Sequence, residues 1–192
     1  MEKILRLLFY KMQIIREKMI GVDFTAEVES RHENHVKYAG STSLINGMLR
    51  AYFLRMNVGE NDSICDVGCG KGKMLYFFSK FPFGQVGGIE YEENLYQICK
   101  KNMEKLKVYR IRVHCGDAAK YDEYDEYNYF YLFNPFHKEI MEGFIDRVRS
   151  SKQQNDRVIR VIYFNPIDID LFLTNGFVVE EELQHKISIL KL

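Results

Sequence analysis

The segment SICDVGCGKGKML (residues 63–75) combines an acidic residue with regularly spaced glycines in a pattern that suits ligand binding. An apolar, strand-like run leads to Asp66 and then to glycines at 68, 70 and 72, and an amphipathic helical pattern follows at once. Such glycines let the backbone turn tightly and approach a ligand closely, with helix N–H groups just behind them. A carboxylate at Asp66 attracts a cationic amino acid and repels a pyrophosphate. The segment therefore favours a ligand with a cationic amino-acid part over a dinucleotide.

Two further acidic residues come at the ends of later strand-like runs. Glu90 ends the run Gly-Gly-Ile-Glu, and Asp117 lies in the run Cys-Gly-Asp-Ala. Open parallel sheets bind ligands at the carboxyl ends of their strands, so we expect both acids to lie near the glycine-rich loop. A carboxylate at Glu90 can accept hydrogen bonds from both ribose hydroxyls, and Asp117 or a nearby backbone amide can reach an adenine edge.

The elements that position these residues follow from alternating patterns after residue 43. Short apolar runs predict strands over residues 63–67, 85–90, 110–115, 127–133 and 157–164. Apolar residues at helical spacing predict helices over residues 43–56, 72–81, 92–106 and 138–149. Repeated strand–helix alternation implies a mostly parallel sheet with right-handed crossovers and helices on both faces.

The C-terminal part departs from this alternation. Pro166 opens a short predicted helix that ends near residue 175, and strand-like runs follow over residues 177–183 and 186–192. The joint between these two runs is too short for a parallel crossover, so it predicts an antiparallel hairpin. Before the fourth strand, the acidic and tyrosine-rich run YDEYDEY (residues 121–127) is interpreted as a solvated turn.

The first 42 residues are predicted to be an extension ahead of one domain over residues 43–192. The apolar residues Leu5, Leu8, Met12, Ile15 and Met19 recur at helical spacing and predict an amphipathic helix. Charged residues interrupt this stretch, so it matches neither a membrane span nor a signal-peptide core. We expect the helix to pack on the domain or to lie over its active site, with attachment to a membrane surface as the alternative. Residues 21–42 are polar and predict a loop or lid.

Taken together, these features resemble the class I S-adenosylmethionine-dependent methyltransferases over residues 43–192. DVGCGKG resembles the family's glycine-rich first motif, GIE its ribose-binding acid, GDA its adenine-contacting turn, and the terminal hairpin its reversed last strand. The resemblance implies a Rossmann-like α/β fold, with a seven-stranded, mostly parallel sheet, helices on both faces and a C-terminal antiparallel β-hairpin.

The resemblance also implies S-adenosyl-L-methionine as the cofactor. It places Asp66 and the loop glycines around the methionine part, Glu90 on the ribose, and Asp117 beside the adenine. The implied cofactor-binding residues are Asp66, Gly68, Cys69, Gly70, Glu90, Tyr91, Asp117, Ala118 and Asn134.

The tripeptide Asn134-Pro135-Phe136 follows the fourth predicted strand. In amino-methylating members of the family, an Asn/Asp-Pro-Pro-aromatic sequence at this place holds the target nitrogen and stacks on the substrate. This chain is one proline short of that pattern, which puts an adenine or glutamine target in doubt. We therefore expect Asn134, Pro135 and Phe136 to be the catalytic residues for methyl transfer to a nitrogen of a protein lysine or a small amine. The alternatives are a nucleic-acid base methyltransferase and, less favoured, a nicotinamide-dependent oxidoreductase.

Composition narrows the partners and the compartment. The chain has 27 basic and 27 acidic residues, so it has no overall field that attracts polyanions, and no stable nucleic-acid partner is expected. Its four cysteines lack paired CxxC spacing, and His32 and His35 in the run HENH are one residue too close for a zinc helix. We therefore expect no metal, free thiols and a cytoplasmic location. All three acids of the expected site are present, which disfavours an inactive binding module.

Overall fold

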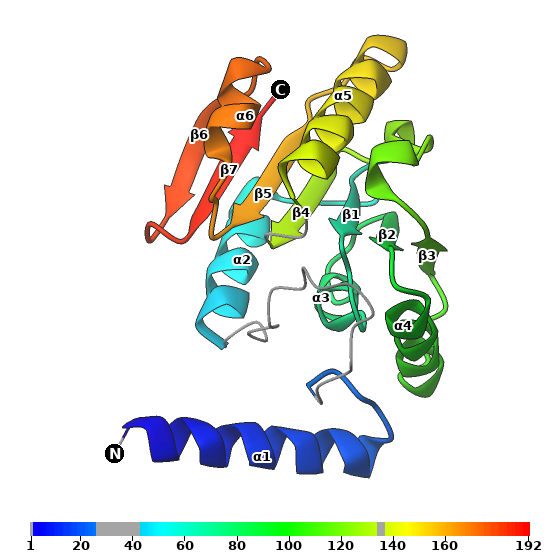
Figure 1. Cartoon of the computed structure of the whole chain (residues 1–192), viewed down its shortest axis with the longest axis vertical. Coiled ribbons are helices and arrows are strands. Elements are labelled where there is room, and N and C mark those ends of the chain that lie inside the picture. Colours follow the sequence, from blue (N-terminus) through cyan, green and yellow to red (C-terminus); the bar gives the residue numbers. More distant parts are fainter. Residues whose placement is uncertain (1, 26–42, 134–136) are drawn as a thin grey trace.

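The computed structural model describes residues 2–25, 43–133 and 137–192. Seven strands form one sheet in the order β3-β2-β1-β4-β5-β7-β6 (Figure 1). The parallel strands are β1 (Ser63–Val67), β2 (Gln85–Glu90), β3 (Ile111–Cys115), β4 (Tyr129–Phe133) and β5 (Arg160–Phe164). The last two strands, β6 (Val178–Leu183) and β7 (Ile187–Lys191), form an antiparallel hairpin whose second strand pairs with β5. The predicted Rossmann-like fold and its terminal hairpin are confirmed.

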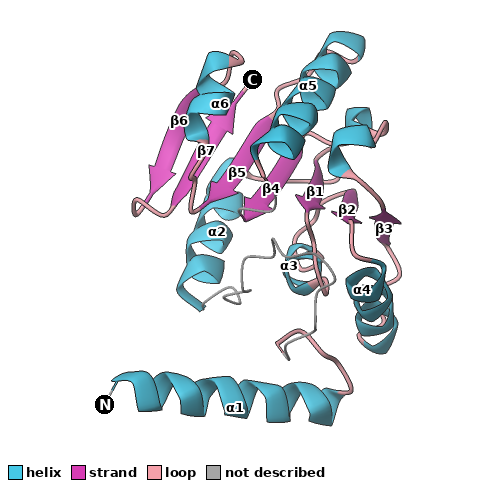
Figure 2. Ribbon diagram, in the orientation of Figure 1, coloured by secondary structure: helices cyan, strands magenta, loops and turns pink. Residues whose placement is uncertain are grey.

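Helices cover both faces of the sheet (Figure 2). One face carries α2 (Ser43–Met56), α3 (Lys73–Phe78) and α4 (Glu93–Lys105). The other carries α5 (Lys138–Gln154), α6 (Ile169–Thr174) and the 3₁₀ turns η1 (Ala118–Lys120) and η2 (Tyr124–Glu126). Successive strand residues point to opposite faces, so Ile64 packs under the first layer while Cys65 and Val67 pack under the second. This alternation directs Asp66 to the same side as Ile64.

The fifth strand begins three residues later than its apolar run predicts, at Arg160. The reason lies in Arg157, whose guanidinium donates to the carbonyls of Tyr127 at 2.8 Å and Tyr124 at 2.7 Å. These hydrogen bonds hold the Arg157 side chain against the preceding turn. Residues 157–159 therefore form a connection that leads into β5 and are not part of the strand. Helix α5 also continues beyond its predicted end at residue 149, to Gln154.

The tyrosine-rich run before β4 is not the solvated turn that its acidity suggests. Tyr121, Tyr124 and Tyr127 are buried, with at most 9% of their surface exposed, while the acids between them face solvent. The Tyr124 hydroxyl donates to the carbonyl of Ala118 at 2.8 Å, and its ring packs edge-on against Phe144 of α5. Tyr124 and Tyr127 both point inward across η2, because 3₁₀ geometry repeats after three residues.

The N-terminal helix α1 (Glu2–Ile20) lies outside the layers of the domain (Figure 1). It ends at Gly21, which takes a left-handed φ of 83° that favours glycine. Met12, Ile15 and Met19 are exposed, so the expectation that this apolar stripe packs on the domain is wrong for these three residues. Within the described ranges, no helix combines the length and apolar character needed to cross a membrane.

Candidate functional site

The glycine-rich loop begins where β1 ends and is shaped by left-handed glycines. Gly68, Gly70 and Gly72 have φ angles of 83°, 54° and 82°, which side chains rarely tolerate. The N–H groups of Gly68 and Cys69 both donate to the carbonyl of Ile89 at 2.9 Å, which ties the loop to the end of β2. The sequence pattern thus produces the tight turn that it predicts.

Glu90 reaches from the end of β2 into this loop. Its carboxylate is 3% exposed and accepts hydrogen bonds from the backbone N–H of Gly70 at 2.7 Å and of Glu92 at 2.9 Å. An ionised carboxylate only accepts hydrogen bonds, and these two backbone donors fix its orientation at the end of β2. The structure therefore brings the glycine loop and the second acid into direct contact.

Asp66 supplies a second buried carboxyl group next to this contact. It is 4% exposed, and it pairs in register with Gly88 of β2. Burial, and next the Glu90 carboxylate, raise the pKa of Asp66 well above its usual range. Within the part of the chain that the structure describes, no hydrogen-bond donor contacts the Asp66 carboxyl group. Two neighbouring acids of this kind suit a ligand that brings hydroxyl groups and positive charge.

The paired glycines of β2 are needed because the sheet is crowded on both sides at this point. A Cβ at Gly88 would lie 2.9 Å from the Cys69 sulfur of the glycine loop, and a Cβ at Gly87 would lie 2.0 Å from the Tyr127 hydroxyl. Both separations are too short for a real contact. The bare backbone of β2 therefore lets the loop fold down over the sheet beside Asp66.

The third acid is placed differently from the first two. The Gly116 N–H donates to the backbone carbonyl of Glu90 at 2.9 Å, so the turn after β3 lies beside the end of β2. The Asp117 carboxylate caps η1 by accepting from the Ala119 N–H at 2.9 Å, and it pairs with Lys120 at 3.2 Å. Asp117 thus has a structural role here, and Ala118 behind it is buried.

Three predicted site residues, Asn134, Pro135 and Phe136, lie outside the described residues. The strand before them is described: β4 ends at Phe133, and Leu132 pairs in register with Val67 of β1. Tyr91 lies just beyond Glu90, with its side chain 54% exposed, and Cys69 is buried in the loop. His32 and His35, excluded above as a metal site, also lie outside the described part.

A buried clamp that the sequence analysis did not single out holds the glycine loop from behind. The Asn102 side chain of α4 is 2% exposed; it accepts from the Asp23 N–H at 2.8 Å and donates to the carbonyls of Asp23 at 2.8 Å and Lys71 at 2.9 Å. Lys71 in turn pairs with the Asp23 carboxylate at 2.8 Å. The sequence feature that could have revealed this clamp is an amide, Asn102, next to the inward-facing Met103 of α4.

Replacing Asn102 with alanine removes three hydrogen bonds at this buried clamp. We expect the free energy of unfolding to fall by about 2 kcal/mol, as for other losses of buried hydrogen-bond partners. Urea denaturation measures the change. Gln97→Ala, on the exposed side of the same helix, is the matched control and should change stability by less than about 0.5 kcal/mol. Equal urea midpoints for Asn102→Ala and the wild type would show that the clamp does not stabilise the fold.

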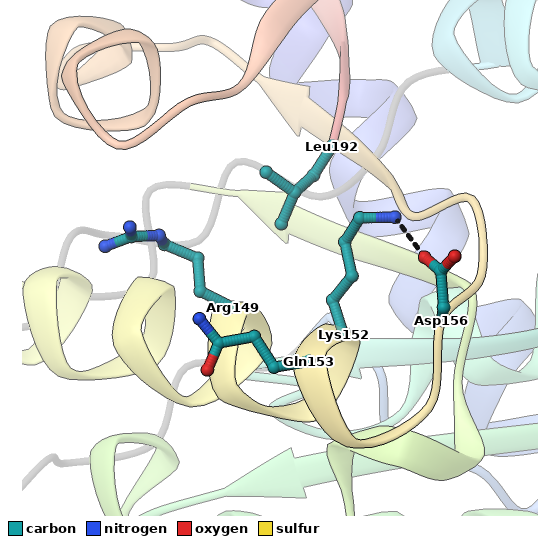
Figure 3. A pocket seen from close by; sticks show the side chains of 5 residues that line it. All are labelled: Arg149, Lys152, Gln153, Asp156 and Leu192. Atoms are coloured by element: carbon teal, nitrogen blue, oxygen red, sulfur yellow. Dashed lines mark hydrogen bonds and ion pairs between the residues drawn. The ribbon is translucent and has the colours of Figure 1, made fainter.

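A separate surface hollow of about 330 Å³ lies at the far end of α5 (Figure 3). Its charged side chains are already paired, since Lys152 contacts Asp156 at 3.1 Å and Arg149 contacts Asn175 at 3.1 Å. The hollow includes the last residue, Leu192, which pairs with Ile159 ahead of β5, so it lies at the opposite edge of the sheet from Glu90. We assign no ligand to it.

Comparison with known proteins agrees with this geometry. Residues 64–153 match the family model described as a methyltransferase domain. No curated protein sequence matches the chain.

Solved structures with the same fold include three with methyltransferase names. A ribosomal protein L11 methylase from Lactobacillus delbrueckii subsp. bulgaricus has a TM-score of 0.59 and 14% identity over 80% of each chain. A precorrin-6y C5,15-methyltransferase from Geobacter metallireducens has a TM-score of 0.60 and 11% identity, over 82% of this chain and 92% of that one. An RNA methyltransferase from Salinibacter ruber, in complex with S-adenosyl-L-homocysteine, has a TM-score of 0.55 and 15% identity, over 80% of this chain and 92% of that one.

The family match covers β1, the glycine loop, β2 and Glu90, which are the parts that form the buried site. The described residues fit the cofactor of this family, because left-handed glycines and two buried acids suit a nucleoside that carries a cationic amino acid. Residues 64–153 thus match a methyltransferase domain, and the described part of the chain has the fold of the class I S-adenosylmethionine-dependent methyltransferases.

Proposed function

We propose that this enzyme methylates a nitrogen atom of a protein lysine or a small amine. The proposal places the catalytic domain over residues 43–192, with residues 1–42 as an N-terminal helix and lid segment. The observation that carries it is the end of β4, where Leu132 pairs in register with Val67 of β1, the strand that leads into the glycine loop. Asn134-Pro135-Phe136 follows β4 directly in the sequence.

In the proposed site, each acid binds a different part of the cofactor. Glu90, fixed by two backbone donors, accepts hydrogen bonds from the ribose hydroxyls. Asp66 neutralises the ammonium of the methionine part, with Gly68, Cys69 and Gly70 forming the wall around it. Asp117 and Ala118 flank the adenine, where the backbone of the turn rather than the capping carboxylate supplies the contacts. Tyr91 and Asn134 complete the binding set.

For methyl transfer, the main task of the protein is to position the acceptor nitrogen relative to the methyl group. S-adenosylmethionine supplies a methyl group that its positive sulfur has already activated for displacement. The chain must hold the acceptor nitrogen in line and exclude water, and well-oriented reactants gain large rate factors from this alone. A lysine-like amine must also arrive deprotonated, and oxygen acceptors at Asn134 would then bind its N–H groups and hold its lone pair in line with the methyl group.

Replacing Asn134 with alanine tests the catalytic assignment. Loss of one neutral hydrogen bond to the acceptor, about 1.4 kcal/mol, should lower kcat roughly tenfold. The affinity for S-adenosylhomocysteine, measured by calorimetry, should change much less, because most of the proposed cofactor contacts come from other strands. Normal turnover by Asn134→Ala on an identified substrate would remove this residue from the mechanism.

The acceptor class is tested with methyl-labelled S-adenosylmethionine and a cell extract. We expect label in protein that survives nuclease treatment, or in small amines that pass a molecular-weight filter. Label that nuclease removes would instead favour a nucleic-acid base. That alternative is kept open by one specific observation, the similarity in fold to an RNA methyltransferase, while the match to a methyltransferase domain removes the support for a nicotinamide-dependent oxidoreductase.

A further inference from the structure

Helix α1 presents an apolar stripe to solvent. Met12, Ile15 and Met19 are three and four residues apart and therefore lie along one side of the helix. Their exposed fractions are 63%, 59% and 84%, and Ile20 beside them is 50% exposed. Figure 1 shows the helix lying outside the layers of the domain. Exposed apolar residues that gather in this way mark an interaction surface.

The charges around this stripe are all of one sign. Between residues 11 and 20, the exposed charged residues are Lys11, Arg16 and Lys18, and the acid Glu17 is buried. By helical geometry, Lys11 and Lys18 lie on one side of the stripe and Arg16 on the other. The helix as a whole contains five basic and two acidic residues. An apolar stripe bordered by basic residues is the pattern of helices that lie in an anionic membrane surface.

The buried side of the helix end explains why the stripe faces outward. The Glu17 carboxylate accepts from the backbone N–H of Phe24 at 2.9 Å and of Thr25 at 2.8 Å, so the chain folds back against this side of the helix. Phe24 then stacks on Tyr76 of α3, with ring centres 6.3 Å apart. The helix is thus anchored to the domain through the face that carries Glu17. The opposite face, with Met12 and Met19, remains exposed to solvent.

We propose that α1 attaches this enzyme to the surface of an anionic membrane. The helix lies in the plane of the interface, its stripe enters the boundary between headgroups and acyl chains, and its lysines and arginine contact lipid phosphates. Charge favours this occupant over a second copy of the chain, because two copies of the stripe would bring like-charged borders together. The proposal does not depend on the identity of the methyl acceptor.

Vesicle co-sedimentation of the full chain tests this inference. The protein should pellet with vesicles of phosphatidylglycerol and phosphatidylcholine, and binding to vesicles of phosphatidylcholine alone should be roughly tenfold weaker. The combined variant Met12→Gln, Ile15→Gln and Met19→Gln should lose roughly tenfold in binding, since it removes the inserted apolar area and keeps good helix formers. Lys11→Gln with Lys18→Gln should weaken the preference for anionic lipid.

The matched control changes three exposed apolar residues elsewhere, as Leu54→Gln, Ile167→Gln and Leu173→Gln, and should bind vesicles like the wild type. Circular dichroism verifies that every variant is folded. Protein that stays in the supernatant with both vesicle types overturns the proposal, and so does equal binding by the stripe variant and the wild type. A wild-type dimer that the stripe variant converts to monomer, with no vesicle binding, would assign the stripe to a second copy.

Discussion

Glu90→Ala is expected to weaken S-adenosylhomocysteine binding by at least about a hundredfold, since two hydrogen bonds to a charged group contribute about 3 kcal/mol or more. The carboxylate acts in two ways. It would accept the ribose hydroxyls, and it already holds the Gly70 N–H at 2.7 Å and the Glu92 N–H at 2.9 Å. Alanine removes both, so the loop loses its fixed position as well as its ligand contact. Isothermal calorimetry at constant pH measures the effect.

Two controls separate these contributions. Glu93→Ala removes an exposed carboxylate three residues away and should leave the affinity within about threefold of the wild type. Glu90→Gln keeps the shape and one oxygen acceptor, so its affinity should fall between the wild type and Glu90→Ala. If Glu90→Ala remained folded and bound S-adenosylhomocysteine as tightly as the wild type, the ribose assignment would be wrong.

The prediction concerns a contact that the sequence could indicate, because its parts are local. Glycine is the residue that adopts left-handed backbone most readily, and Gly68, Gly70 and Gly72 all adopt it. Apolar runs before the loop and before Glu90 indicated buried parallel strands, and parallel strands end at one edge of a sheet. Local propensity and strand order were therefore enough to bring the loop and Glu90 together.

The clamp behind the loop could not be predicted in this way. Asn102 joins Asp23 to Lys71, which are 48 residues apart in sequence, through hydrogen bonds of a side chain to backbone groups. Asparagine is common at exposed positions, so the residue type alone does not predict a buried structural role for Asn102. Only the burial of Asn102 on the inner side of α4 distinguishes it, and burial depends on what packs against the helix.

The apolar stripe of α1 shows a related limit. The spacing of Met12, Ile15 and Met19 predicts a helix with one apolar side, and α1 is present. The same spacing does not tell whether that side meets the domain or another surface, because both remove apolar area from water. The buried Glu17 decides the matter, since its contacts with residues 24 and 25 turn the stripe away from the domain.

Asp66→Asn is expected to weaken S-adenosylhomocysteine binding roughly thirtyfold near pH 8, because one charged hydrogen bond contributes about 2 kcal/mol. In the free protein, burial and next the Glu90 carboxylate raise the pKa of Asp66 well above its usual range. A bound ammonium favours the ionised carboxylate and lowers that pKa, so binding releases a proton. Affinity is therefore highest above the raised pKa and falls by up to about tenfold per pH unit below it.

Calorimetry between about pH 5 and pH 8.5 follows this dependence, with the ligand ammonium charged at most of these values. The affinity of Asp66→Asn should stay nearly constant over the range, because asparagine does not titrate. Asp146→Asn, at an exposed position of α5, should keep the wild-type profile. A wild-type affinity that rises as the pH falls would contradict the assignment of Asp66 to a cationic group.

The stability of the free protein should change in the opposite direction from its affinity. Because the folded pKa of Asp66 lies above its unfolded value, the stability that its neutral form contributes is present at low pH and is lost as the pH rises through the raised value. Asparagine keeps the shape and stays neutral, so Asp66→Asn should match or exceed the wild-type free energy of unfolding near pH 8. A variant both less stable and weaker in binding would instead indicate that this carboxyl group supports the fold.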